Sequence, residues 1–427
     1  MLEDLPSRIR NGNVVISVVG LGRVGLPLAV AFAHRGLFVI GVDKNEDAVS
    51  SVSRGKAPFH YPEIEQWLGD AISRGRLRVT LSVAEAVKQS DVVVVTVGTP
   101  TGSQFQLDYS QIQSAFRDLA RAGLKDKAVI VRSTSVPGTL VGIILPLLMK
   151  ETGLKPETDF ALAVCPERIL EGQAHRELFV LPEIIGGVGN LSSNIASELF
   201  RKLGNDKEVV LLTPTGAELA KLFTNIYRYV NFALANEFAI WAERYDEDAG
   251  SIIQAANRDY SRSRIPMPGF AGGPCLGKDG LLLDNNTTFS SIVSVAWKLN
   301  EAIPQHVVSS IAREIGSLYG RKIAVLGLAF KSESDDVRLS PSAKLVEILE
   351  AYGARVCVHD PYIKATASLE ETLDSPEVVV LATNHSAFRH LAPLIDKSGC
   401  KLVYDVWRVF DPKSFQSAKY ASFGKAR

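Results

Sequence analysis

A cysteine in a glycine-rich loop is the strongest candidate for chemistry in this 427-residue chain. Cys275 follows Gly272-Gly273-Pro274 and precedes Lys278 and Asp279. A nearby cation favours the reactive thiolate, and backbone amides left accessible by glycines can hold an oxyanion. A buried structural cysteine is the alternative, but the glycine density here favours a reactive thiol. The remaining cysteines have no comparable surroundings and are interpreted as structural: Cys165, Cys357 and Cys400.

A second pattern is typical of a dinucleotide-binding turn. Gly20-Leu21-Gly22-Arg23-Val24-Gly25 follows an apolar run and opens a helical pattern, and Asp43 ends the next apolar run. The first glycine permits the tight turn, the second lets backbone approach a pyrophosphate, and the third lets helix and strand pack closely. A carboxylate at position 43 suits ribose hydroxyls and would repel a 2′-phosphate, although Lys44 slightly weakens this preference. We therefore predict NAD as the cofactor, with a purely structural glycine turn as the alternative.

A thiol next to a nicotinamide has a defined chemical use. It can add to an aldehyde to give a thiohemiacetal, whose hydride leaves to NAD, and water then hydrolyses the resulting thioester. A dehydrogenase that stops at a ketone needs no such thiol. The two patterns together therefore predict an oxidation that continues past the carbonyl stage.

The elements that must position these residues alternate between strand and helix patterns over roughly the first 200 residues, which indicates a parallel sheet covered on both faces. The predicted strands are Val14–Val19, Phe38–Val42, Val92–Val97, Val129–Val131 and Phe160–Val164. Two long helical patterns follow, Thr215–Tyr245 and Ser290–Leu318, the second interrupted only by Pro304. A loop rich in Gly and Pro, residues 266–280, separates them.

A strand pattern resumes in the last third of the chain, at Lys322–Leu326, Val356–His359, Val378–Ala382 and Leu402–Asp405. It opens with Gly327-Leu328-Ala329-Phe330-Lys331, a turn without a second glycine, so close approach of a pyrophosphate is less plausible there. This part either binds a different nucleotide through side chains such as Lys331 and Arg338 or is structural. The predicted fold class is α/β, with two Rossmann-like doubly wound domains (1–205 and 306–427) joined by a central helical domain (206–305).

The composition limits the classes of binding partner that the chain is expected to have. The 47 Lys plus Arg balance the 47 Asp plus Glu, so no bulk charge favours nucleic acid or an anionic membrane. The cysteines show no metal-ligand spacing and indicate reduced thiols, hence no metal and a reducing compartment. The apolar stretches Val14–Val19 and Leu140–Met149 are shorter than a signal-peptide core and a bilayer span of about 20 residues, respectively. We expect a soluble, cytoplasmic protein.

Ordered motifs across the chain resemble the UDP-glucose/GDP-mannose dehydrogenase family of nucleotide-sugar 6-dehydrogenases. They are GLGRVGLP from Gly20, VGTPT at Val97–Thr101, RSTSVPGT at Arg132–Thr139, CPERILEG at Cys165–Gly172, ELAKLFTN at Glu218–Asn225, the GGPCLGKD loop, and GLAFKSESDDVRLSPS at Gly327–Ser342. The resemblance implies oxidation of a sugar C6 alcohol to a carboxylate with two NAD, and a dimer built on the helical domain. It also implies a place in polysaccharide biosynthesis.

The resemblance assigns roles by position. Cys275 is similar to the family nucleophile, and Asp279 to the carboxylate that orients the hydrolytic water. Lys221 and Asn225, one helical turn apart, resemble the pair that stabilises the oxyanion. Glu167 resembles the acid/base that assists thioester hydrolysis. The alternatives are a solvated surface charge for Lys221 and a simple ion pair with Arg168 for Glu167.

Further residues are implied at the cofactor and the substrate. Thr134 resembles the hydroxyl that positions water and cofactor, with a helix cap before Pro137 as the alternative. The other implied cofactor contacts are Thr99, Pro100 and Arg338, the last one reaching across the dimer. The implied substrate contacts are Arg168, Glu171, Lys221, Asn225, Arg258, Phe270, Gly272 and Lys331. The partner-subunit arginine is assigned to Arg258, with Arg264 as the other candidate.

The substrate remains open between two sugars. The CPER form places Arg168 after Glu167, and the GGPC form places Pro274 before the cysteine. Both look more like family members acting on UDP-N-acetylhexosamines, particularly N-acetylmannosamine, and an arginine can hydrogen-bond an acetamido carbonyl. UDP-glucose is the alternative substrate. A β-hydroxyacid dehydrogenase explains neither the thiol nor the third domain, and a non-catalytic NAD-responsive binding protein has no use for Cys275.

Overall fold

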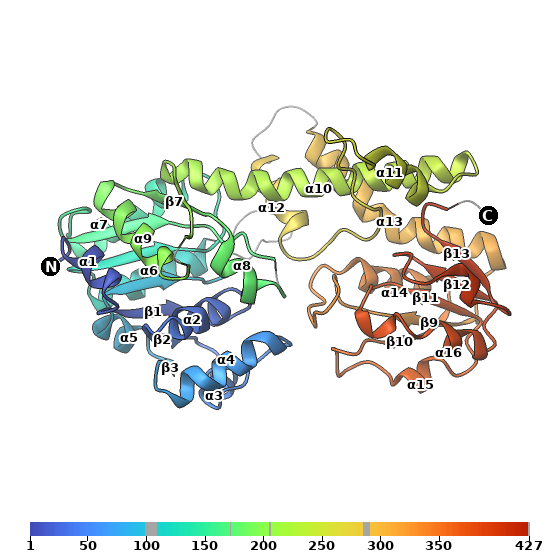
Figure 1. Cartoon of the computed structure of the whole chain (residues 1–427), viewed down its shortest axis with the longest axis horizontal. Helices are drawn as coiled ribbons and strands as arrows, with labels where there is room; N and C mark the ends of the chain where they lie inside the picture. The colour runs from blue at the N-terminus through green and yellow to red at the C-terminus, as the bar shows by residue number, and fades with distance from the viewer. Residues whose placement is uncertain (99–108, 171, 205, 285–290, 426–427) are drawn as a thin grey trace. The chain divides into compact units, whose positions relative to one another are not determined.

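The computed structural model describes residues 1–98, 109–170, 172–204, 206–284 and 291–425. The chain divides into two compact units, Met1–Phe223 and Thr224–Arg427. Figure 1 shows the elements of both. The described part contains no helix that is long and apolar enough to cross a membrane.

The first unit contains an eight-stranded sheet in the order β3-β2-β1-β4-β5-β6-β7-β8. Its strands are β1 (Val15–Val19), β2 (Phe38–Val42), β3 (Leu77–Thr80), β4 (Val92–Val95), β5 (Lys127–Val131), β6 (Phe160–Val164), β7 (Glu183–Gly187) and β8 (Val209–Leu211). All neighbours pair in parallel except β6 and β7, which are antiparallel. The order of the first six strands is that of a dinucleotide-binding Rossmann domain, with the order reversing between β1 and β4.

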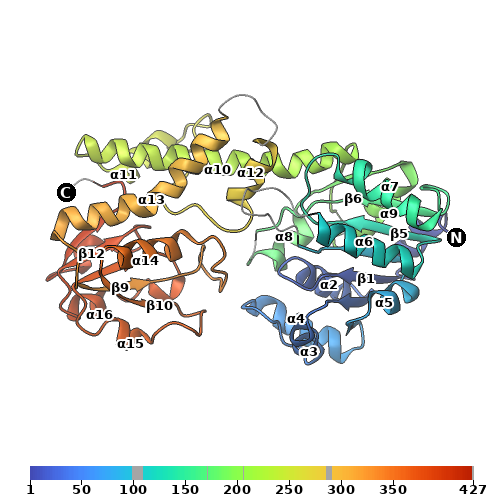
Figure 2. The same cartoon turned by 180° about the vertical axis from the view of Figure 1, so that it is seen from behind.

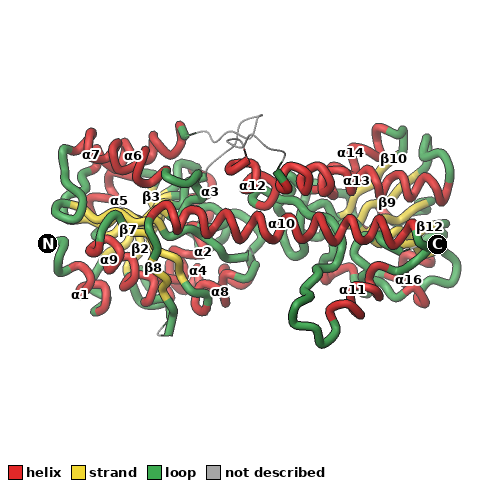
Figure 3. Tube along the Cα trace, turned by 90° about the horizontal axis from the view of Figure 1, so that it is seen from above, coloured by secondary structure: helices red, strands yellow, loops and turns green. Residues whose placement is uncertain are grey.

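Helices cover both faces of this sheet, as the apolar strands require. They are α1 (Leu5–Arg10), α2 (Gly25–His34), α3 (Glu46–Ser53), α4 (Pro62–Ser73), α5 (Val83–Gln89), α6 (Ser110–Ala122), η1 (Leu140–Ile144), α7 (Leu145–Thr152), α8 (Ala174–Val180) and α9 (Asn190–Arg201). One core cluster lies under α1, α2, α4, α8 and α9, and a second lies under α5, α6 and α7 on the other face (Figure 3). The predicted parallel sheet with two covered faces is therefore confirmed.

The middle of the chain is helical. α10 (Pro214–Arg244) runs unbroken for 31 residues and is followed by α11 (Ala249–Asn257), α12 (Leu276–Asp284) and α13 (Ile292–Ile315), which contains Pro304. The two long helices agree with the predicted patterns within a few residues. The short helix α12 begins inside the segment predicted as a Gly/Pro loop.

The second unit contains a five-stranded parallel sheet in the order β10-β9-β11-β12-β13. Its elements are β9 (Lys322–Leu326), α14 (Pro341–Ala351), β10 (Arg355–His359), α15 (Leu369–Thr372), β11 (Val378–Leu381), η2 (Ser386–Phe388), α16 (Ala392–Lys397), β12 (Leu402–Asp405), η3 (Pro412–Ser414) and β13 (Lys419–Ser422). The α13 and α14 helices lie on one face, and α15 and α16 lie on the other (Figure 2). This is a second doubly wound domain, so the α/β fold with a helical region between two Rossmann-like domains is confirmed.

Candidate active site

The glycine-rich turn follows β1 and leads into α2, at the reversal of strand order. Gly20 has φ +102°, a backbone conformation that favours glycine. A Cβ on Gly25 would lie 1.8 Å from the Gly20 carbonyl oxygen, so this glycine is required for the close packing of helix and turn. A Cβ on Gly22, in contrast, would meet no atom of the described residues within 4 Å. The protein itself leaves space at Gly22, and the turn therefore fits a pyrophosphate that approaches the backbone there.

The acidic residue predicted for the ribose directly follows β2. Asp43 accepts the Leu21 N–H on Oδ2 at 2.7 Å and the Asn45 N–H on Oδ1 at 2.9 Å, and its side chain is half-buried. The carboxylate is thus fixed beside the glycine-rich turn. Val24 is the residue before α2 and is partly exposed. Thr99 and Pro100 lie outside the described residues.

The second glycine turn repeats the first in part. Gly327 has φ +94°, and Asp360 accepts the N–H groups of Leu328 and Ala329 as Asp43 accepts that of Leu21. Asp360 is buried, however, and its Oδ2 lies 3.1 Å from Nε2 of His385. Because α14 begins only at Pro341, a long loop replaces the tight turn. The buried Asp360 carboxylate is therefore not accessible to a ribose, unlike that of Asp43.

The long loop carries two of the predicted contact residues. Lys331 is half-buried. Arg338 is exposed, and its Nε lies 2.9 Å from Oδ1 of the buried Asp336. Positive φ values at Glu333 and Leu339 bend the loop sharply on either side of Asp336.

The Thr134 segment lies between β5 and η1. Glu218, on α10, accepts hydrogen bonds from Ser135 Oγ at 3.1 Å, Gly138 N at 2.6 Å and Leu140 N at 2.9 Å. Burial raises the pKa of Glu218 despite these bonds. The residue before η1 is Thr139, so Thr134 does not cap the helix. Sequence reasoning did not single out Glu218, which ties the Thr134 segment to the helix that carries Lys221.

The Glu167 carboxylate makes a different ion pair from the one considered in the sequence. Its Oε2 lies 2.9 Å from Nε of Arg132, and its Oε1 accepts the N–H groups of Arg168 and Ile169, each at 2.8 Å. The Arg168 guanidinium instead donates to the Pro182 carbonyl. The simple pair of Glu167 with the side chain of Arg168 is therefore wrong. Glu171 lies outside the described residues.

Two predicted residues lie one turn apart on α10. The Lys221 side chain is buried, which excludes the solvated surface charge considered from the sequence. Asn225 is also buried, and its Nδ2 donates to Oδ2 of Asp279 at 2.6 Å. The structure thus brings together Asn225 and Asp279, which are 54 residues apart in sequence.

Cys275 immediately precedes the first residue of α12, and its side chain is exposed. Its carbonyl accepts the Asp279 N–H at 3.1 Å, as in the first turn of a helix. The partial positive charge at a helix amino terminus stabilises a thiolate. The structure therefore places an accessible thiol, one helical turn from a buried carboxylate, where its anion is favoured.

The glycines before the cysteine serve packing as well as access. A Cβ on Gly273 would lie 2.5 Å from the Phe330 ring, and one on Gly272 would lie 2.5 Å from Cδ of Pro341. Gly273 N also donates to the Leu339 carbonyl at 2.9 Å. These contacts fix the cysteine loop against the 327–342 loop. Phe270 belongs to the core cluster of the second unit, so its side chain is buried.

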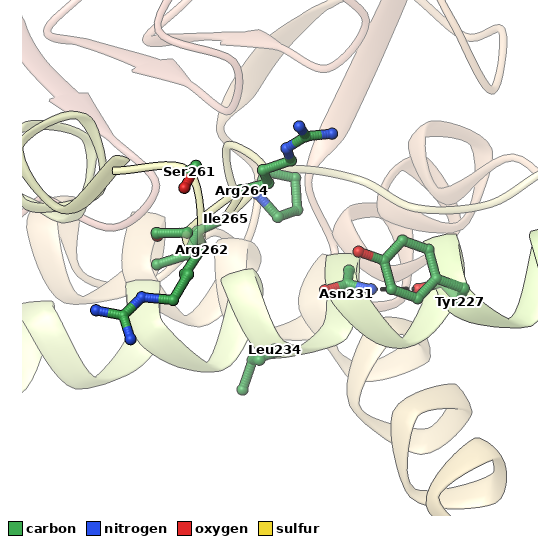
Figure 4. Close-up of a pocket in the computed structure, with 9 residues that line it drawn as sticks. Tyr227, Asn231, Leu234, Ser261, Arg262, Arg264 and Ile265 are labelled. Atoms are coloured by element: carbon green, nitrogen blue, oxygen red, sulfur yellow. Dashed lines mark hydrogen bonds between the residues drawn. The ribbon is translucent and has the colours of Figure 1, made fainter. Parts of the chain in front are cut away.

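The two candidate arginines lie beyond α11. Arg258 and Arg264 are both exposed, and Asn257 ties the connecting loop by accepting the Ile265 N–H at 3.0 Å. Arg264 also lines a pocket of about 410 Å³ between this loop and α10. Figure 4 shows Arg262 and Arg264 pointing in different directions from the loop, with Tyr227 on the helix.

A Rossmann domain with an open glycine-rich turn, and an accessible cysteine beside a buried carboxylate, define an NAD-dependent dehydrogenase. Models of the UDP-glucose/GDP-mannose dehydrogenase family match three segments: its NAD binding domain at residues 14–204, its central domain at 215–302 and its UDP binding domain at 324–412. The chain belongs to this family of nucleotide-sugar dehydrogenases.

Individual relatives are similar over most of their length. UDP-N-acetyl-D-mannosamine dehydrogenase of Pyrococcus horikoshii is 37% identical over 381 residues, which cover 88% of this chain and 90% of the relative. The solved structure of the UDP-D-ManNAc dehydrogenase from that organism has a TM-score of 0.89, with 34% identity over 96% of this chain and 99% of that one. A UDP-glucose dehydrogenase structure from Pyrobaculum islandicum has a TM-score of 0.86, with 29% identity over 97% of this chain and 98% of that one.

Proposed function

We propose that the chain oxidises the C6 hydroxyl of UDP-N-acetyl-mannosamine to the uronate, in two steps at one thiol. The observation that carries this proposal is the position of Cys275, exposed at the amino end of α12, with Asp279 buried one turn later and bonded to Asn225. A dehydrogenase that stops at a carbonyl does not need this arrangement. Bound NAD supplies the hydride acceptor for both oxidations.

The first oxidation depends on the α10 pair. As the alcohol becomes an aldehyde, the C6 hydroxyl proton passes to solvent water and a hydride leaves C6, while Lys221 and Asn225 stabilise the negative charge that develops on the C6 oxygen. The Cys275 thiolate then adds to the aldehyde carbon and forms a thiohemiacetal. The same pair stabilises that oxyanion before the second hydride leaves. The burial of Lys221 strengthens this interaction, because a charge acts more strongly away from water.

The second stage releases the product. Loss of the second hydride leaves a thioester on Cys275, and water must attack its carbonyl carbon. We assign Glu167 as the base that takes the proton from this water, with Asp279 and Thr134 orienting it. The Cys275 thiolate leaves, and the uronate is released. Lys331 contacts the substrate, and Arg338 and a partner-subunit arginine, Arg258 or Arg264, complete the two binding sites in this proposal.

The choice of N-acetyl-mannosamine rests on the relatives and on two local differences. The P. horikoshii relative is named for this substrate. Arg168 lies next to Glu167, and Pro274 next to Cys275, in the forms that resemble acetamido-sugar enzymes. Arg168 is half-buried, so its guanidinium is partly desolvated and suited to a carbonyl oxygen. UDP-glucose is the alternative, as in the Pyrobaculum relative.

Three further features belong to the same proposal. Tyr227, Leu234 and Trp241 form an exposed apolar stripe along α10 with heptad-like spacing, which a second copy of the chain would cover in a dimer. We propose domains at 1–205, 206–305 and 306–427, with the central helices providing that contact.

A reactive Cys275 requires reducing surroundings, which favours the cytoplasm, and the UDP-uronate product suits polysaccharide biosynthesis.

A substrate panel tests the proposal. Purified protein is mixed with NAD and, in turn, UDP-N-acetyl-mannosamine, UDP-N-acetyl-glucosamine, UDP-glucose and GDP-mannose, and kcat/KM is measured from NADH. We expect the highest kcat/KM with UDP-N-acetyl-mannosamine, and an Arg168→Leu variant should lose this preference. A higher value for UDP-glucose would overturn the substrate assignment. Absence of NADH with every sugar would overturn the activity.

A further inference from the structure

A buried cluster of charged side chains and one thiol lies at the ends of β5, β6 and β7 in the first sheet. Its members have no role in the proposal above. Arg132 directly follows β5, Cys165 directly follows β6, and Glu183 is the first residue of β7. Because β5 and β6 are parallel and β7 runs antiparallel to β6, the carboxyl ends of the first two strands meet the amino end of the third. These side chains therefore converge, with Lys207 adding a second cation beside Glu183.

One side of the Arg132 guanidinium contacts Glu183 and Phe200. Its Nη1 donates to Glu183 Oε2 at 2.8 Å, and Lys207 Nζ lies 3.2 Å from Oε1 of the same carboxylate. The guanidinium also lies 4.6 Å above the Phe200 ring and is only 1% exposed. Burial opposes its charge, but the carboxylates of Glu167 and Glu183 raise the pKa of Arg132 well above its ordinary value. The group is a permanently charged guanidinium with little freedom to move.

The other side of the guanidinium faces Glu167. Arg132 Nε donates to Glu167 Oε2 at 2.9 Å, and the Arg132 carbonyl accepts the Glu167 N–H at 3.3 Å. Among the described residues, three groups donate to the Glu167 carboxylate: Arg132 Nε and the N–H groups of Arg168 and Ile169. The two amides fill both acceptor sites of Oε1, whereas Arg132 fills one of the two on Oε2. Within the part of the chain that the structure describes, one acceptor site on Oε2 has no donor, and Arg132, which fills the other, determines its direction.

We propose that Arg132 is a positioning residue for the second half of the reaction, acting through Glu167; this inference rests on the role assigned to Glu167 above. Held by Glu183, Arg132 fixes the Glu167 carboxylate and aims the remaining acceptor site of Oε2 at the hydrolytic water. Water oxygen bonds to the thioester carbon while its proton passes to Oε2, the C–S bond breaks, and the Cys275 thiolate leaves. The products are the uronic acid group, the Cys275 thiolate and protonated Glu167, with one water consumed and no change of oxidation state.

The inference separates the two stages of the reaction. Within the described residues, the Arg132 side chain bonds to Glu167, Glu183 and Cys165, none of which is assigned to hydride transfer, so its loss should slow only thioester hydrolysis. In Arg132→Lys the charge remains, but one ammonium cannot span Glu167 and Glu183 as the planar guanidinium does. In Glu183→Gln the hydrogen bond from Arg132 weakens because its acceptor is no longer charged, while the side chain keeps its shape. Glu167→Gln serves as the reference for a lost base.

The test is rapid mixing of each variant with NAD and the nucleotide sugar, followed by intact-protein mass measurement. In Arg132→Lys we expect an NADH burst of two per Cys275 at the wild-type rate, then turnover slowed about 10-fold or more, with the acyl adduct accumulating on Cys275. Glu183→Gln should show the same change to a smaller degree, and it tests the inference if Arg132→Lys fails to fold. Arg8→Lys alters the distant ion pair with Asp91 and should leave burst and turnover unchanged.

Three results would contradict the inference, and they can be told apart. If Glu167→Gln accumulates the acyl adduct but Arg132→Lys and Glu183→Gln do not, Arg132 does not act through Glu167, and the proposed function stands. If Glu167→Gln itself forms no adduct and turns over normally, the assignment of Glu167 is wrong, and the role of Arg132 falls with it. A slower burst in the Arg132 variant would also reject the inference, because it would show a general structural defect.

Discussion

Two glycines of the first turn, Gly22 and Gly25, offer a comparison that separates cofactor binding from folding. Alanine at Gly22 would meet no atom of the residues that the structure describes within 4 Å, and the backbone there has no positive φ, so the fold should accept the methyl group. Replacing glycine at such a position changes stability by about 0.4–1 kcal/mol in the stabilising direction. The same methyl group would occupy the space into which the pyrophosphate approaches. We expect Gly22→Ala to fold normally and to bind NAD at least about 10-fold more weakly, a loss of about 1.4 kcal/mol.

Gly25→Ala is the matched variant with the opposite expectation. Its Cβ would lie 1.8 Å from the Gly20 oxygen and 2.4 Å from Thr96 Oγ1, so backbone must move. Overpacking of this kind costs about 1–3 kcal/mol or more. At about 2–4 °C per kcal/mol for a unit of this size, the midpoint of thermal unfolding should fall by roughly 2–12 °C.

Thermal unfolding without cofactor and calorimetric titration with NAD measure both quantities on the same samples. Gly22→Ala should change the NAD dissociation constant without lowering the unfolding midpoint, whereas Gly25→Ala should lower the midpoint. If Gly22→Ala binds NAD like the wild type, the turn does not receive the pyrophosphate. If Gly22→Ala destabilises the protein as much as Gly25→Ala does, the fold has no space for a methyl group at Gly22.

Three further outcomes follow from single contacts. Glu218→Ala removes the acceptor for three donors, each of which costs about 1–3 kcal/mol if it is left buried and unpaired. Chemical denaturation should therefore show a free energy of unfolding lower by several kcal/mol. The exposed control Glu208→Ala should lower it by about 0.5 kcal/mol or less. Burial opposes the charge of Asp360, but the hydrogen bond from His385 and those from backbone amides lower its pKa. The contribution of Asp360 to folding stability is therefore complete above the pKa of about 3.9 in the unfolded chain, and it is lost as the pH falls through the lower pKa of the folded state. Unfolding of Asp360→Asn should accordingly depend less on pH below about 4, and an unchanged dependence would reject this cause. Trp241→Glu should give a monomer in sedimentation at a concentration where the wild type is a dimer, and an unchanged dimer would place the interface elsewhere.

The fold could be predicted from the sequence wherever a strand is a continuous apolar run. Phe38–Val42 and Phe160–Val164 are strands with the predicted bounds, because strands buried on both faces need apolar residues throughout. β3 (Leu77–Thr80) and β13 (Lys419–Ser422) were not predicted, since these edge strands mix polar and apolar residues. β7 ends in two glycines and runs antiparallel, and neither feature follows from the alternation of strands and helices.

The site could be predicted where its signal is local. Lys221 and Asn225 share a helix face by spacing alone, and the glycine turn is contiguous. The bond from Asn225 to Asp279 joins residues that only the packing of α10 against α12 brings together. Arg132 was not singled out, because its partner Glu183 reaches it only through the reversal at β7. Contacts of this kind depend on sheet topology, which residue spacing does not encode.

The most direct test of the central claim is the ratio of NADH formed to uronate released, measured for the wild type and for Cys275→Ser. Two hydride transfers at one thiol require two NADH per uronate from the wild type. The hydroxyl of serine is a far weaker nucleophile than a thiolate, so the variant should release little or no uronate. One NADH per sugar with an aldehyde product, or uronate from Cys275→Ser at the wild-type rate, would contradict the covalent mechanism.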